Sequence, residues 1–184
     1  MTMQSTKPIK KLRRYNYILA LDPSGSYYEG KGTTGYCLFD TIRQRFVFCG
    51  SIYAKDFSDM EAYWNSVIEL VYATARTHKK LIVVCEDYLL YAARIQSQIN
   101  SRMETPKLIG CLQWFCYMHN IPYHMQTASE VKTRWSNDIL VYKNYIRPYG
   151  HGYKPTSGNT DTYTHHSLDA IRHAVHFNTF KNEV

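Results

Sequence analysis

Short apolar runs separated by polar turns dominate the first half of the chain, and this pattern predicts a β-sheet. The run Tyr17–Leu21 has the length of a strand, ends directly in Asp22, and is followed by a Pro-Ser-Gly turn. The runs Gly35–Phe39 and Arg45–Ile52 are rich in residues that favour strands. We expect these three runs to form an antiparallel meander.

Helical spacing of the apolar residues begins after the meander. Ser58 and Glu61 have the spacing of a capping box, and the periodic residues behind them predict a helix over 59–77. The run Leu81–Cys85 is apolar without interruption, as in a strand that is buried on both faces, and Glu86 ends it. A second strand therefore also ends in a carboxylate.

The second half of the chain predicts further helices around one short strand. Thr105 and Pro106 suit the cap and first turn of a helix that ends near residue 118. Ile121–Met125 has the length of a strand. The last helix is expected over 164–177, where the apolar stripe leaves Asp169 on another face. The segment 87–105 has no clear period and reads as an irregular loop, and the basic segment 132–158 is expected to be partly mobile.

Composition fits a single packed domain. A chain of 184 residues can fill one core, and 45% hydrophobic with 20% charged residues excludes disordered and low-complexity chains. We expect this domain over residues 16–184. No stretch approaches the ~18 consecutive apolar residues of a membrane span, so neither membrane insertion nor secretion is expected.

The net charge of +7 is concentrated at one end of the chain. The first fourteen residues hold five basic and no acidic side chains, which leaves +2 for the rest. We expect residues 1–15 to form a flexible basic arm that suits a polyanionic partner such as nucleic acid. An organelle transit peptide is disfavoured because the segment is short and contains one serine. The five cysteines form no CxxC pair, which is typical of reduced core thiols in a cytoplasmic protein.

Three carboxylates occupy positions that suit a binding site: Asp22 and Glu86 follow strands, and Asp169 lies off the apolar stripe of the last helix. Hard divalent cations bind such oxygens, and two cations about 3.5–4 Å apart can assist in-line cleavage of a phosphodiester. Taken singly, each acid could equally be a surface group or a helix cap. Together they predict a metal site.

The order of short motifs around these acids resembles the RuvC-type Holliday junction resolvases of the ribonuclease H-like superfamily, and the phage-encoded members look most similar. The resemblance covers residues 17–177. The matching motifs are Asp22-Pro23-Ser24-Gly25, Thr34-Gly35-Tyr36, Val83-Val84-Cys85-Glu86, Val131-Lys132 and His165-His166-Ser167-Leu168-Asp169-Ala170. It implies an α/β fold, a mixed five-stranded sheet flanked by helices.

The resemblance also implies roles for individual residues. Asp22, Glu86 and Asp169 would be metal ligands, with His166 in the fourth position and His165 as the alternative. The expected cofactor is Mg²⁺, with Mn²⁺ as a second choice. Lys132 would stabilise charge at the scissile phosphate as part of the catalytic set.

DNA contacts are implied for a wider set of aromatic and basic residues. Tyr88 and Tyr91 could stack on unpaired bases at the junction centre, and other residues could contact the DNA backbone. The basic candidates are Arg94, Lys132, Arg134 and Lys143. Two departures from the family flank the expected site: a longer loop over 26–33 and an insertion over 144–163. Both could change which DNA is accepted.

The favoured function is a metal-dependent endonuclease that cuts Holliday junctions or other branched DNA by paired nicking. Symmetric cutting of a two-fold junction needs two equivalent sites, so a homodimer is expected, and the helix over 106–118 is apolar enough to form its interface. One alternative is a nuclease specific for forks, flaps or phage DNA. An actin-like phosphotransferase is disfavoured because the chain has no room for a second domain. A non-catalytic DNA-binding module would not need all three acids.

Overall fold

The computed structural model describes residues 13–28, 31–89, 102–160 and 163–183. Six strands form one mixed sheet in the order β5-β4-β1-β2-β3-β8. The strands are β1 (Tyr17–Asp22), β2 (Thr33–Asp40), β3 (Arg45–Tyr53), β4 (Leu81–Asp87), β5 (Tyr123–Thr127) and β8 (Asn159–Thr160). The first three form the expected antiparallel meander, while β4 and β5 run parallel to β1. The sheet thus has the five expected strands and a short sixth, β8, beside β3.

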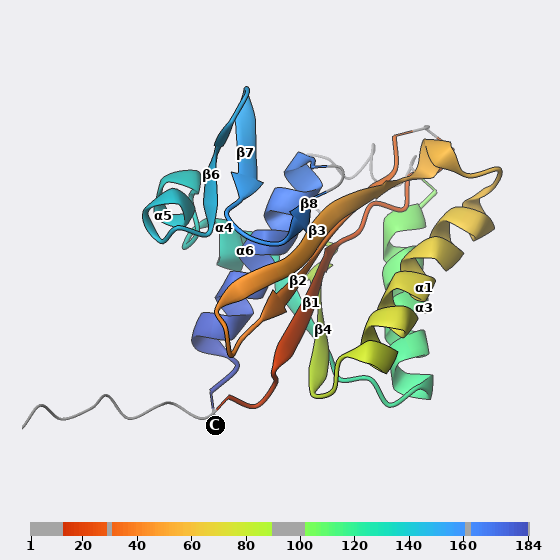
Figure 1. Ribbon diagram of the computed structural model, residues 1–184. Coiled ribbons are helices and arrows are strands. Elements are labelled where there is room, and N and C mark those ends of the chain that lie inside the picture. Colours follow the sequence, from red (N-terminus) through yellow and green to blue (C-terminus); the bar gives the residue numbers. More distant parts are fainter. Residues whose placement is uncertain (1–12, 29–30, 90–101, 161–162, 184) are drawn as a thin grey trace, which may run out of the picture.

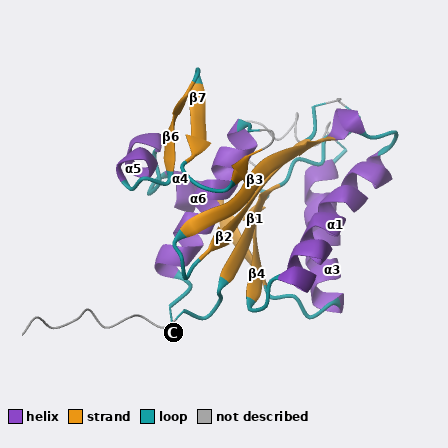
Figure 2. Cartoon of the chain, in the orientation of Figure 1, coloured by secondary structure: helices purple, strands orange, loops and turns teal. Residues whose placement is uncertain are grey.

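Helices cover both faces of this sheet (Figures 1 and 2). On one face lie α1 (Met60–Thr77) and α3 (Glu104–Met118), and on the other lies α6 (His165–Phe180). The alternation of side chains along β1 explains the two layers: Ile18 and Ala20 are buried towards α6, whereas Leu19 and Leu21 are buried towards α1 and α3. None of the described helices is long and apolar enough to cross a membrane.

Two helix starts differ from the sequence prediction. The cap of α1 is Asp59, which accepts a hydrogen bond from the amide of Ala62, so the expected Ser58 cap lies one residue too early. Helix α3 begins at Glu104, after Met103 in a left-handed conformation with φ 55°. Thr105 is therefore no cap. Its hydroxyl instead accepts a 3.0 Å hydrogen bond from the amide of Gly25, which ties the turn after β1 to α3.

The basic segment 132–158 contains regular elements. After α4 (Ala128–Lys132) come α5 (Asn137–Tyr142) and a hairpin of β6 (Ile146–Tyr149) and β7 (Gly152–Pro155). In Figure 1 this hairpin stands out from the body of the domain, above the N-terminal end of α6. The part of the chain that the sequence marks as an insertion is thus largely a two-stranded ribbon.

The last residues of the expected basic arm contact the other end of the chain. The Arg13 guanidinium donates a 2.6 Å hydrogen bond to the carbonyl of Asn178, and the amide of Arg14 donates a 3.0 Å bond to the carbonyl of Asn182. Residues 1–12 lie outside the described part of the chain. The cysteines are all free thiols; Cys111 is exposed and the other four are buried.

Candidate metal centre

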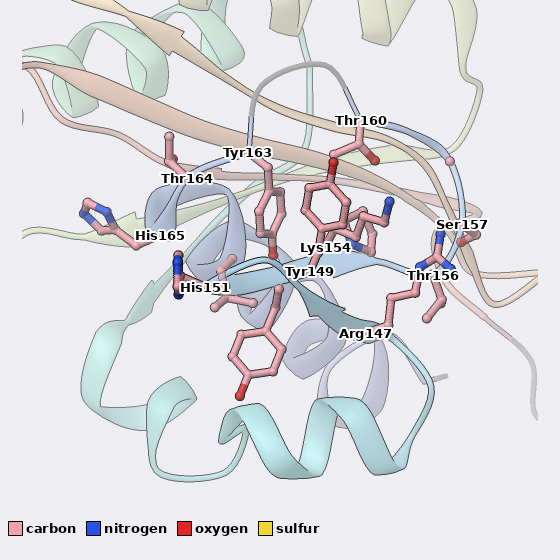
Figure 3. A pocket seen from close by; sticks show the side chains of 15 residues that line it. Arg147, Tyr149, His151, Lys154, Thr156, Ser157, Thr160, Tyr163, Thr164 and His165 are labelled. Carbon is pink, nitrogen blue, oxygen red and sulfur yellow. The ribbon is translucent and has the colours of Figure 1, made fainter.

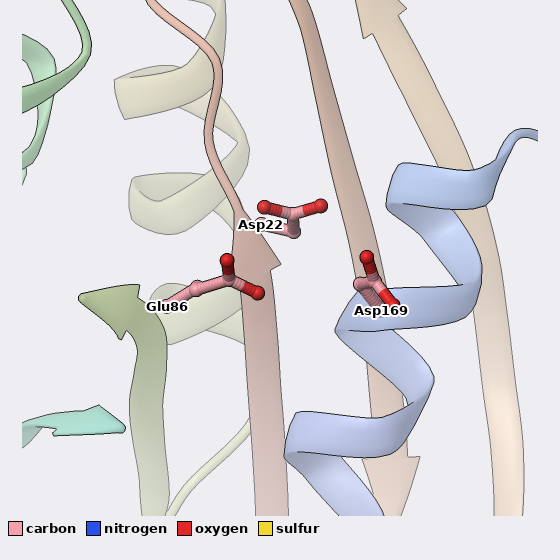
Figure 4. Close-up of side chains that lie close together, drawn as sticks. All are labelled: Asp22, Glu86 and Asp169. Carbon is pink, nitrogen blue, oxygen red and sulfur yellow. The ribbon is translucent and has the colours of Figure 1, made fainter. Parts of the chain in front are cut away.

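Three carboxylates meet at one edge of the sheet: Asp22 at the end of β1, Glu86 near the end of β4 and Asp169 on α6 (Figure 4). One oxygen from each lies within 4.8 Å of the others. Because β1 and β4 are parallel neighbours with Leu21 paired to Cys85, the residues that follow this pair reach the same edge. The strand-end acids singled out in the sequence therefore come together as expected.

Helix α6 reaches this edge because β2 lets it approach closely. A Cβ atom added at Gly35 would lie 2.1 Å from the carbonyl carbon of His166, so no larger residue fits without moving the helix. The Ser167 hydroxyl donates a 2.7 Å hydrogen bond to the carbonyl of Gly50 on β3. Thr164 caps the helix in a capping box with Ser167. These contacts fix the first turns of α6, which carry His166 and Asp169.

Each carboxylate has a basic partner. Nδ1 of His166 lies 2.7 Å from Oδ2 of Asp22, and Nζ of Lys132 lies 2.8 Å from Oδ2 of Asp169. Asp169 also pairs with Arg172 through its other oxygen. Nε2 of His173 lies 2.8 Å from Oε2 of Glu86.

Arg172 and His173 are residues that sequence reasoning missed. Arg172 Nε also donates a 3.0 Å hydrogen bond to the carbonyl of Trp135. His173 is fully buried, with Nδ1 3.0 Å from Oε1 of Gln126 on β5. They follow Asp169 by three and four residues, the spacing that places side chains on one helix face, so that spacing was the available signal.

The electrostatics of the cluster favour a cation. Burial raises the pKa of Asp22 to about 6; the hydrogen bond from His166 opposes this, while the charges of Glu86 and Asp169 add to it. Burial alone would lower the pKa of His166, but its bond to Asp22 outweighs this and the pKa is raised. Burial would likewise lower the pKa of Lys132, but the bond to Asp169 outweighs this and the pKa is raised.

These donors fit a divalent metal ion. Three carboxylate oxygens within one small volume are the hard ligands that Mg²⁺ and Mn²⁺ prefer. The pKa of Asp22 is raised mainly by burial and further by the charges of Glu86 and Asp169, and a cation bound to the three oxygens would favour the charged carboxylate. An acidic triad able to bind a metal ion is therefore present, and His166 stands beside it with Nδ1 engaged by Asp22.

His165, the alternative fourth ligand, has different surroundings. Its ring lies 4.0 Å from that of His166, measured between centroids, and it lines a separate pocket next to the β6–β7 hairpin. Burial, with the charge of His166, lowers its pKa. The geometry therefore favours His166 over His165 as the histidine of the acidic cluster.

The expected DNA-binding residues lie in several places. Among those that the structure describes, only Lys132 contacts the acidic cluster. Tyr88 lies just beyond β4 and packs against the core on the α1 side, and Lys143 is exposed at the end of α5. The Arg134 guanidinium lies 5.0 Å from the ring centroid of Phe180, at the far end of α6 from His166. Tyr91 and Arg94 fall outside the described residues, and for all of these DNA contact stays a prediction.

No protein-family model matches the sequence, and no curated protein is detectably similar to it. The fold is nevertheless similar to two solved structures of Thermus thermophilus RuvC. The RuvC structure in complex with a Holliday junction substrate has a TM-score of 0.63 and 9% identity, over 92% of this chain and 100% of that chain. A second RuvC structure has a TM-score of 0.51 and 10% identity, over 91% and 98% of the two chains. The ribonuclease H-like α/β fold of RuvC is thereby confirmed for this chain.

Proposed function

We propose that this protein is a divalent-metal-dependent endonuclease that resolves Holliday junctions or related branched DNA by paired nicking. The observation that supports this is the cluster of Asp22, Glu86 and Asp169 at the edge of a RuvC-like sheet, with Lys132 beside it. Carboxylates next to a basic side chain suit a phosphodiester substrate only if a cation lies between them. We expect Mg²⁺, or Mn²⁺ in its place, and a cytoplasmic protein that uses the single domain over 16–184.

Each residue of the cluster has a defined task in this proposal. Asp22, Glu86 and Asp169 would hold the metal, with His166 as the fourth ligand once it releases Asp22. When bound, divalent cations supply the Lewis-acid chemistry that activates water and neutralises charge on the phosphate. The Lys132 ammonium is about half exposed, so it can donate to a phosphate oxygen while keeping its bond to Asp169. The expected products carry 5′-phosphate and 3′-hydroxyl ends.

An exposed aromatic patch on α3 supports a homodimer. Trp114 is 63% exposed, Tyr117 72% and Met118 57%. The rings of Trp114 and Tyr117 stack with centroids 5.6 Å apart. Large aromatic side chains are enriched in protein interfaces, and a two-fold pair would give two equivalent sites for a two-fold junction. We propose that this face of α3 contacts a second copy of the chain.

Cleavage of defined DNA structures tests the proposal. A labelled four-way junction is compared with a matched fork, flap and linear duplex, in Mg²⁺, in Mn²⁺ and in EDTA. The matched control is Asp169→Asn, which removes a ligand charge and leaves the basic surface intact. We expect paired nicks in the junction with either metal, none in EDTA, and binding without cleavage for Asp169→Asn.

The other outcomes separate the alternatives. Equal or faster cutting of forks and flaps would keep the nuclease but assign it to general branched-DNA processing. Tight binding of the junction with no cutting in either metal would refute the nuclease and favour a DNA-binding module. Nicking of one strand only, by a monomer, would refute paired resolution.

A further inference from the structure

The β6–β7 hairpin and the start of α6 line an open pocket of about 700 Å³ (Figure 3). The hairpin contributes Arg147, Tyr149 and Lys154 to its lining, and α6 contributes His165. His165 and Leu168 of the lining directly precede His166, which bonds Asp22, and Asp169, so the pocket and the acidic cluster lie on neighbouring faces of the same turns of α6. A ligand in the pocket would therefore adjoin the metal centre.

The charges of the hairpin are arranged for an anion. Arg147 and Lys154 lie directly opposite each other in the antiparallel ladder, so their side chains share one face of the ribbon. Like charges placed opposite each other destabilise a strand pair. Within the described residues no carboxylate pairs with either of them, and none lines the pocket. An anionic ligand would remove this repulsion.

One face of the ribbon packs against the domain and the other is exposed. Ile146 and Pro155, a cross-strand pair, are buried, and Tyr153 packs against the core; Tyr153 and Pro155 also line the pocket. The opposite face is open, with Tyr149 64% exposed and Nζ of Lys154 3.9 Å from its ring centroid. This cation–π contact holds the ammonium in place on the ribbon. One face thus anchors the hairpin and leaves the basic face free for a ligand.

The remaining lining is suited to phosphate and sugar. Thr156, Ser157, Thr160 and Thr164 line the same pocket. The hydroxyls of Thr156, Ser157 and Thr164 also make hydrogen bonds within the protein. Arginine, lysine, serine and threonine side chains make most of the backbone contacts in protein–DNA complexes.

We propose that the basic face of the β6–β7 hairpin, with the pocket beneath it, binds the phosphodiester backbone of a DNA strand that continues beyond the acidic cluster. This inference extends the proposed nuclease function and rests on it for the choice of ligand. The subsite adds affinity and fixes the path of the strand. It takes no part in the cleavage step.

The test measures binding without metal, so that it is independent of cleavage. Arg147→Ala/Lys154→Ala is compared with Arg76→Ala/Lys79→Ala, which removes two exposed charges near the start of β4, the opposite end of that strand from Glu86. Fluorescence anisotropy in EDTA records affinity for a labelled four-way junction, and circular dichroism confirms that both proteins are folded. We expect the hairpin variant to bind about tenfold more weakly or worse, with a salt slope reduced by ~1.8 for two lost phosphate contacts. The control should stay within about twofold of the wild type.

Several results would overturn the inference. Equal losses in both double variants would mean that only net charge matters, and no loss in the hairpin variant would exclude the subsite. Competition by a free mononucleotide as strong as that by an oligonucleotide would assign the pocket to nucleotides. Failure of the proposed function is distinguishable from these, because a protein that binds through Arg147 and Lys154 but cuts no DNA refutes the nuclease alone.

Discussion

His173 should position Glu86 for metal binding, so its removal should lower the affinity of the protein for the metal. The imidazole is fully buried and joins Glu86 to Gln126 through its two ring nitrogens, at 2.8 Å and 3.0 Å. In His173→Ala both partners lose this contact, and the Glu86 carboxylate becomes free to turn. Removing a residue that hydrogen-bonds a metal ligand typically lowers metal affinity about 10–100-fold.

His176 offers a matched control on the same helix. It is also buried, at 1% exposure, and its Nε2 lies 3.2 Å from Oε1 of Glu130, outside the acidic cluster. Each alanine variant opens a cavity and removes a side-chain hydrogen bond, for a cost of about 2–5 kcal/mol in unfolding free energy. The two variants should therefore be similarly destabilised without metal.

Urea unfolding with and without Mn²⁺ separates positioning from simple destabilisation. A loss of about 10–100-fold in affinity lowers the stabilisation by saturating metal by ~1.4–2.7 kcal/mol. We expect this loss for His173→Ala and none for His176→Ala, with His173→Gln in between because its amide can still donate to Glu86. Equal metal-dependent stabilisation of the two alanine variants would refute the positioning role.

Three further predictions address the dimer, the electrostatics and the packing of the site. Trp114→Glu places a charge in the aromatic patch of α3 and should convert a dimer to a monomer in light scattering; an unchanged mass would exclude this interface. Because the folded state raises the pKa of Asp22 to about 6 and also raises that of His166, it binds protons more tightly than the unfolded chain. The lowered pKa values of His124, His165 and His176 give the opposite trend, so the pair is isolated by the difference in stability between the metal-free wild type and Asp22→Asn. This difference should fall as the pH rises from 3.8 through about 6, and Mg²⁺ should reverse the loss; a rise in the difference over this range would contradict the shifts. Gly35→Ala should push α6 from β2, at a cost of more than ~3 kcal/mol, and reduce cleavage, whereas wild-type stability and activity would show that the approach is not tight.

The acidic cluster was predictable because it depends on local pattern and strand direction. Asp22 and Glu86 each end an apolar run, and parallel strands place such ends together. Asp169 was recognisable from its place off the apolar stripe of α6. The pairing of His166 with Asp22 required in addition the close approach at Gly35, which the sequence shows as part of the Thr34-Gly35-Tyr36 motif but not as a contact with α6.

The hairpin carried a signal that the sequence analysis did not use. Gly150 and His151 form a two-residue loop between β6 and β7, and Gly150 has φ 56°. A glycine at that position is typical of tight hairpin turns. The basic residues on either side favour exposure to solvent, and on that ground the segment was expected to be partly mobile.

The start of α3 and the partners of the acids could not be read from local pattern. Met103 takes a left-handed conformation that methionine does not favour. The Thr105 hydroxyl accepts a hydrogen bond from the amide of Gly25 instead of capping α3. Similarly, Gln126 meets His173 only because β5 pairs with β4 in one register. Such contacts are set by tertiary packing, which overrides local preference.

Helix α6 explains how a fold shared at 9% identity can support a site of this geometry. Its apolar face needs only residues of suitable volume against β1 and β2, so most positions there can change. Its polar face must place Asp169, Arg172 and His173 at fixed points against Lys132 and Glu86, which few substitutions allow. Its first turn is held by the contacts at Gly35 and Gly50, while His165 on this turn lines the hairpin pocket. Under the proposed function we therefore expect the hairpin to influence the substrate preference of this protein, and the acidic cluster with its partners to govern cleavage.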